Sequence, residues 1–159
     1  HGAFQGFAMS DERLWPVYET CQELAIPIIA HSGPDHDHKG FAEPRAFANM
    51  LKAFPHLRMV VAHLGGAAWK QTLEIAQTFP NAYFDCCEII EWTRSTHGPT
   101  DKQLAQMIID IGPERVMMGS DFPWYDLDHS IERVFSLPLL SQEQKERIIG
   151  ANAVDILGL

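Results

Sequence analysis

Basic residues are scarce in this chain. It holds 12 Lys and Arg against 21 Asp and Glu, which gives a formal net charge of -9, and the few basic residues do not gather in one segment. Proteins that bind nucleic acids neutralise phosphates with clustered Lys and Arg. We therefore expect no nucleic-acid partner, although the acidic balance does not by itself identify a substrate.

Long apolar runs and a disulfide pattern are missing as well. No stretch approaches the roughly 20 apolar residues of a membrane-spanning helix, so we expect no membrane partner. The cysteines are Cys21, Cys86 and Cys87, an odd number with two adjacent members, which is not the pattern of a disulfide framework. A reducing, cytoplasmic location is the resulting expectation, and we interpret one of the adjacent pair as a core residue.

Several common motifs are absent too. The sequence has no Gly-rich phosphate loop, no dinucleotide-binding fingerprint and no serine nucleophile elbow. An initial methionine is also lacking: the chain opens at His1 in a loop-like phrase, whereas GANAVDILGL at its end is typical of a finished helix. We expect residues 1–159 to form a single domain that is the C-terminal part of a longer protein.

What the chain does contain is a regular alternation of helical patterns and short apolar runs. The runs predict buried strands over residues 26–31, 58–62, 82–86 and 115–119. Helical patterns cover residues 10–25, 44–54, 67–79, 100–111 and 152–157, and a capping box at Ser141 predicts one more helix. Helices between successive strands make parallel βα units, which fit an open doubly wound sheet or half of a (β/α)8 barrel of about 250 residues.

Three of the strands end in a residue that can bind a metal ion. His31 ends IPIIAH, His63 ends LRMVVAH and Asp121 ends RVMMGSD. The carboxyl ends of parallel strands lie on one rim, so we expect these side chains to share it. Each residue also has a structural alternative: a buried histidine bonded to backbone for the first two, and a helix N-cap for the aspartate. A divalent ion explains all three at once, because buried polar groups need partners.

Weaker candidates lie in the loops that follow these strands. His36 and His38 are more typical of a solvated loop than of a second metal site or a lid. Glu88 is either a rim residue or an exposed loop residue. Trp124 and Tyr125 follow the strand-end aspartate, where they either wall a substrate pocket or pack the loop onto the fold.

These residues stand in phrases that resemble the amidohydrolase-related family, the amidohydrolase 2 branch of the metal-dependent amidohydrolase superfamily. The matching phrases are IPIIAHSG, FPHLRMVVAHLGG, NAYFDCCE, RVMMGSDFPW and GANAVDILGL. The resemblance spans nearly the whole chain from about Leu14 and implies an α/β fold, a partial (β/α)8 TIM barrel with strands five to eight. The family's His-x-His pair on the first strand has no counterpart here, which implies that the N-terminal half is missing.

The resemblance also implies roles for individual residues. His31 and Asp121 match metal ligands, and Asp121 also matches the usual general base. His63 matches the histidine that contacts substrate or assists proton transfer, and Trp124 is expected to contact substrate as well. The implied cofactor is a divalent metal, with zinc as the first expectation and manganese as the alternative.

Three functional hypotheses follow from the resemblance. The first is a metal-dependent hydrolase in which an ion-activated water and the Asp121 base attack a small organic acid, amide or ester. The second is a metal-dependent decarboxylase of an aromatic or unsaturated acid. The third is an inactive half-barrel, whose open strand edges favour a homo-oligomer. An unrelated open-sheet binding module, with His31 and Asp121 in structural roles, is the remaining alternative.

Overall fold

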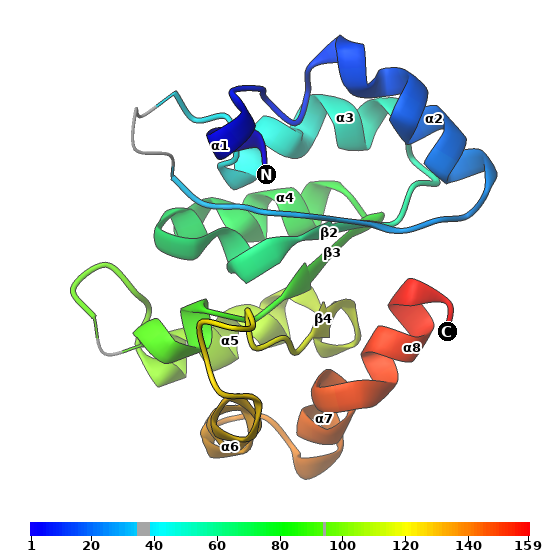
Figure 1. Ribbon diagram of the computed structural model, residues 1–159. Helices are drawn as coiled ribbons and strands as arrows, with labels where there is room; N and C mark the ends of the chain where they lie inside the picture. The colour runs from blue at the N-terminus through cyan, green and yellow to red at the C-terminus, as the bar shows by residue number, and fades with distance from the viewer. Residues whose placement is uncertain (35–38, 94) are drawn as a thin grey trace.

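The computed structural model describes residues 1–34, 39–93 and 95–159, which form a four-stranded parallel sheet (Figure 1). The strand order follows the chain: β1 (Ile28–Ala30), β2 (Met59–Val61), β3 (Ala82–Asp85) and β4 (Val116–Met117). Each predicted strand is present, although each is shorter than its apolar run. An order that never reverses is that of a barrel wall, whereas a doubly wound sheet changes direction at a switch point.

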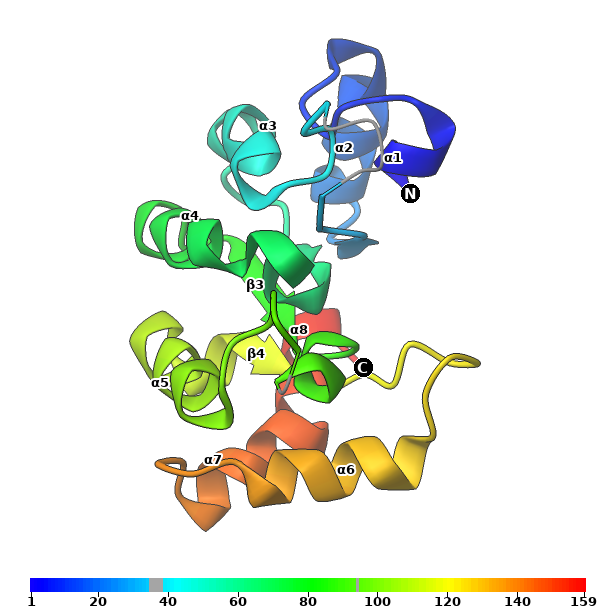
Figure 2. The same cartoon turned by 90° about the vertical axis from the view of Figure 1, so that its left-hand side faces the viewer.

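Helices connect the strands, and α3, α4 and α5 stand in one column on the same face of the sheet (Figure 2). The α-helices are α1 (Gly2–Gln5), α2 (Trp15–Glu23), α3 (Ala48–Ala53), α4 (Thr72–Thr78), α5 (Asp101–Ile111), α6 (Leu127–Ser136), α7 (Gln142–Glu146) and α8 (Asn152–Leu157). The tighter turns are η1 (Glu12–Leu14), η2 (Pro44–Phe47), η3 (Ala62–Gln71), η4 (Ile89–Trp92) and η5 (Pro113–Arg115), and η6 (Arg147–Ala151) is π-helical. Among the described residues, no helix has the length and apolar character needed to cross a membrane.

Side-chain caps set the helix starts, for the most part as predicted. Thr100 accepts a hydrogen bond from the backbone N–H three residues on, and Ser141 does the same, so both helices begin with a full capping box. The helix that the sequence predicts over residues 10–25 is shorter in the structure, where it corresponds to η1 and α2. Asp11 caps a 3-10 turn, and the regular helix begins only at Trp15.

The main core lies between the sheet and the column of helices. Phe47, Met50, Leu104 and Ile108 pack from the helical side, and Phe84 meets them from the middle of the sheet. Each of these side chains is fully buried, and full burial of such a side chain stabilises the fold by about 1.5 to 3 kcal/mol. This core therefore holds the strands in the fixed arrangement on which the rim depends.

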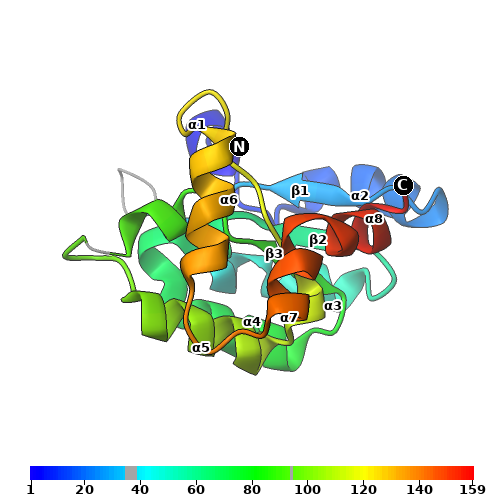
Figure 3. The same ribbon diagram turned by 90° about the horizontal axis from the view of Figure 1, so that it is seen from below.

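The opposite face of the sheet is covered only in part. Val60 and Met117 form a small buried cluster with Ile156 of α8, which Figure 3 shows next to the strands. Ile29, on the edge strand β1, is 54% exposed. The cover of this face therefore ends before β1.

Polar side chains close the amino-terminal ends of the strands. Asn81 Nδ2 donates to three carbonyls between the end of α3 and the start of β2. The Arg115 guanidinium donates to carbonyls at the end of α4 and at the start of β3. Asn152 Nδ2 donates to the carbonyls of Pro113 and Val116, at 2.7 Å each. These side chains donate to backbone carbonyls, several of which also accept a backbone N–H, and so join the ends of helices and strands.

We expect Asn152→Ala to lower the free energy of unfolding by about 1 to 3 kcal/mol, because it removes two hydrogen bonds to backbone carbonyl groups. Chemical denaturation followed by circular dichroism measures the loss. Asp155→Ala is the matched control in the same helix: it removes only an exposed ion pair with Arg147, worth at most about 1 kcal/mol. Equal losses in the two variants would contradict the assigned role of Asn152.

Candidate functional site

Strained backbone gathers at the carboxyl ends of the strands. Six non-glycine residues of the described chain have a positive φ, and four of them, His63, Leu64, Glu88 and Asp121, follow β2, β3 or β4. Such conformations cost on the order of 1 to 3 kcal/mol each and persist only where neighbouring groups hold them. The rim is therefore built to place these side chains and not for stability alone.

A single buried carboxylate oxygen holds much of this rim. Asp85, the last residue of β3, is 4% exposed. Its Oδ1 accepts hydrogen bonds from the His63 backbone N–H at 2.8 Å, the Cys87 backbone N–H at 3.3 Å and the Cys87 thiol at 2.7 Å. Burial raises the pKa of Asp85 against the lowering effect of these contacts. Asp85 thus fixes the turn after β2 to the turn after β3.

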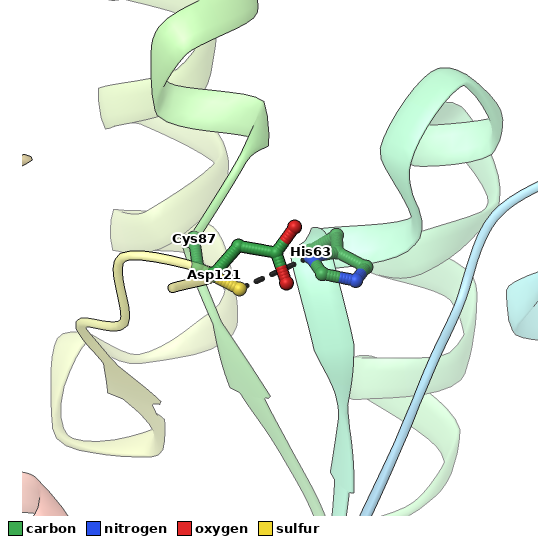
Figure 4. A group of neighbouring side chains, drawn as sticks. All are labelled: His63, Cys87 and Asp121. Carbon is green, nitrogen blue, oxygen red and sulfur yellow. Dashed lines mark hydrogen bonds between the residues drawn. The ribbon is translucent and has the colours of Figure 1, made fainter. Parts of the chain in front are cut away.

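The His63 ring lies between two different neighbours. Its Nδ1 is 3.0 Å from Cys87 Sγ, and its Nε2 is 3.1 Å from His31 Nδ1. Figure 4 draws the contact with Cys87 as a dashed line. Glu88 Oε2 lies 3.7 Å from the same Nδ1, and burial raises the pKa of the Glu88 carboxyl. Both ring nitrogens are therefore engaged, one toward the thiol and one toward His31.

His31 stands at the end of β1, where its ring stacks on His1 with the centroids 3.8 Å apart. Partial burial, and then the nearby His63, lower the pKa of His31. The imidazole is neutral at pH 7, so it keeps a nitrogen lone pair that can bind a metal ion.

The structure brings His63 and Asp121 together, and it adds a residue that the sequence did not single out. One donor atom each from His63, Cys87 and Asp121 lies within 4.8 Å of the other two (Figure 4). Nitrogen, sulfur and carboxylate oxygen are ligands that zinc accepts, so the donors present fit a divalent ion. His31 contacts His63 but does not belong to this group of three.

A cavity of about 500 Å³ opens beside the rim, within the size range of small-molecule sites. His31 and Glu88 line it, together with Lys39, Phe41 and Trp92. A ligand in the cavity would therefore meet two side chains of the rim, one cationic side chain and two aromatic rings.

The two tryptophans near the rim differ from the expectation. Trp124 is 79% exposed and is not among the residues that line the cavity, so its contact with substrate stays a prediction. Trp92 does line the cavity, and its Nε1 donates to the Tyr125 hydroxyl at 3.1 Å. The sequence feature that could have indicated this role is the position of Trp92 in the loop after the third strand. His36 and His38 lie outside the described residues.

Comparison with known proteins agrees with this architecture. A family model described as amidohydrolase matches residues 1–159. The chain belongs to the amidohydrolase family. A curated relative is 2-amino-3-carboxymuconate-6-semialdehyde decarboxylase of Dictyostelium discoideum, which is 24% identical over an alignment of 186 residues. The alignment covers 97% of this chain and 51% of the relative. The chain thus spans about half the length of that relative.

Solved structures confirm the predicted partial barrel. An uncharacterised TIM-barrel protein of Bordetella bronchiseptica is 25% identical, with a TM-score of 0.77 over 96% of this chain and 52% of its own. A dihydroxybenzoic acid decarboxylase of Polaromonas, with bound manganese and the inhibitor 2-nitroresorcinol, is 16% identical, with a TM-score of 0.72 over 96% and 55%. The open doubly wound sheet is therefore the wrong alternative, because the four strands match about half of a barrel.

We expect Gly65→Ala to lower the free energy of unfolding by about 2 to 4 kcal/mol. Gly65 has φ 84°, and an added Cβ would lie 2.6 Å from both Pro44 Cγ and Thr72 Oγ1. Gly150→Ala is the matched control: a Cβ there meets nothing within 4 Å, so it should stabilise the helix by about 0.5 to 1 kcal/mol. Denaturation measures both, and a neutral Gly65→Ala would contradict the close approach at this turn.

Proposed function

We propose that this chain supplies one half of the active site of a metal-dependent decarboxylase that acts on a small aromatic or unsaturated carboxylic acid. The carrying observation is the meeting of His63 and Asp121 at the carboxyl ends of parallel strands. His31, which contacts His63, lines a cavity of about 500 Å³. Two of the relatives named above are decarboxylases, which supports lyase chemistry. The chain spans about half the length of each of these two proteins, so we propose the activity for the complete protein that carries this chain.

The cavity suits an aromatic acid. Phe41 and Trp92 offer flat apolar walls for a ring, and the Lys39 ammonium, which also lines the cavity, attracts a carboxylate. His31 reaches the same space from the rim.

The proposed mechanism assigns the proton to Asp121. His31 and Asp121 would hold the ion, which when bound stabilises negative charge on the substrate's oxygen atoms. Asp121 takes a proton from water and delivers it to the carbon that carries the carboxylate; the bond between that carbon and the carboxylate breaks, and carbon dioxide leaves. The His63 donor atom lies within 4.8 Å of the Asp121 carboxylate, and its ring stabilises the negative charge that develops on the substrate by hydrogen bonding.

Hydrolysis was the first choice from the sequence, and it would use the same residues. Asp121 would then take a proton from water and pass it to a leaving group. The printed names of the relatives favour decarboxylation over this alternative. Zinc and manganese both remain candidates for the ion, since the Polaromonas relative contains manganese and the donors here also suit zinc.

The test is release of carbon dioxide from hydroxybenzoic acids, 2,6-dihydroxybenzoate among them, by the complete gene product that carries this chain, with Mn²⁺ or Zn²⁺ added. We expect Asp121→Asn to lower kcat at least about 100-fold, because general acid–base catalysis contributes that much or more. Asp128→Asn, an exposed position in the first turn of α6, should retain full activity.

Three results would contradict the proposal: hydrolysis of amide or ester substrates without carbon dioxide release, equal activity in the two aspartate variants, and no metal-dependent turnover of any acid. The same assay on the 159-residue chain alone tests the inactive half-barrel. Turnover by the chain alone would exclude that hypothesis, and activity confined to a longer gene product would support it.

A further inference from the structure

We propose that Cys87 supplies a thiolate ligand for a thiophilic divalent ion that His63 and Asp121 also bind. This cation position is distinct from the His31 and Asp121 pair, although it shares Asp121. It lies on the side of the His63 ring that faces the thiol, whereas His31 contacts the other ring nitrogen. It shares His63 and Asp121 with the proposed reaction, but it needs no substrate, so its test is separate from the test of that reaction.

The distances are those of a site that a small shift would complete. In a tetrahedral zinc site with Zn–S near 2.3 Å and Zn–N near 2.0 Å, a sulfur and a nitrogen ligand lie about 3.5 Å apart. Cys87 Sγ and His63 Nδ1 are 3.0 Å apart, and the Asp121 donor lies within 4.8 Å of both residues' donors. Because ligand atoms on one tetrahedral ion lie about 3.5 Å apart, shifts of about 1 Å or less per side chain bring the three onto one ion.

Neighbouring residues give Cys87, and not Cys86, access to this position. Cys86 is fully buried in the main core, where it packs among apolar side chains. Cys87 lies in the turn after β3, and its Sγ is 3.0 Å from His63 Nδ1 and 2.7 Å from Asp85 Oδ1, on the rim. Gly119 leaves the necessary room, because a Cβ at that position would lie 3.2 Å from Cys87 Cβ.

Asp85 supports the ligands from behind. Its Oδ1 accepts from the backbone N–H groups of His63 and Cys87, which fixes the chain at two of the three donors. It also accepts the thiol hydrogen at 2.7 Å. Without an ion, Cys87 is a neutral thiol that donates its hydrogen to Asp85. With an ion, it would be a thiolate ligand. On ion binding the S–H bond breaks, the sulfur–metal bond forms, and the proton passes to solvent.

The donor set determines which ions this position selects. Thiolate and imidazole ligands favour Zn²⁺ and Co²⁺, whereas Mn²⁺ prefers carboxylate and water oxygen. We therefore expect zinc to bind here in preference to manganese. The His31 and Asp121 pair lacks sulfur and gives no such selection by itself.

The experiment is titration of the purified, reduced 159-residue chain with Co²⁺ in the absence of substrate. A thiolate ligand produces a sulfur-to-cobalt charge-transfer band in the near ultraviolet. We expect the band in the wild type and in Cys86→Ala, and its loss in Cys87→Ala with at least about 10-fold weaker cobalt binding, the smallest loss that even outer residues of metal sites cause. Zinc should abolish the band, and the same concentration of manganese should leave it.

Circular dichroism of each variant shows whether the fold survives, and Asp121→Asn gives a second check that keeps all three thiols. That variant should bind cobalt more weakly and still show the band. Absence of the band in the folded wild type would overturn the proposal. So would its persistence in Cys87→Ala or its loss in a folded Cys86→Ala, because the thiolate would then be a different one.

Discussion

The rim of this chain depends on one buried oxygen atom, Asp85 Oδ1. It binds the backbone N–H of His63 and both the backbone and the thiol of Cys87, so it joins two turns that the sheet alone would not hold together. Hydrogen bonds to a carboxylate inside a protein are stronger than neutral ones, and a lost partner there is costly. The left-handed backbone at His63 is stable because this acceptor lies beneath it.

The two ends of the sheet use polar side chains for opposite purposes. At the amino-terminal end, Asn81, Arg115 and Asn152 donate to backbone carbonyls, and the contacts are complete without a ligand. At the carboxyl end, the side chains of His63 and Asp121 lie close together, and His31 and Glu88 line a cavity. This is the division of labour known from barrel enzymes, where stability resides at one face and chemistry at the other.

The sequence was sufficient for the strands, their parallel order and the meeting of His63 with Asp121, because apolar runs and the rule of carboxyl ends determine these features. It did not reveal Cys87, since nothing in two adjacent cysteines shows which one faces the rim. It also gave Trp124 more weight than Trp92, because loop conformation decides which ring reaches the cavity. The left-handed conformation at His63 was equally hidden, since only neighbouring contacts make a non-glycine residue adopt it.

The unequal ends of the strands also have a consequence for motion. The amino-terminal end is held by Asn81, Arg115 and Asn152, whereas the carboxyl end carries residues in left-handed conformations. Opening of the rim therefore releases backbone strain, which partly offsets the cost of breaking the contacts of Asp85. Fluctuations that begin there leave the column of helices packed. The rim can thus rearrange around a bound ligand much faster than the whole chain unfolds.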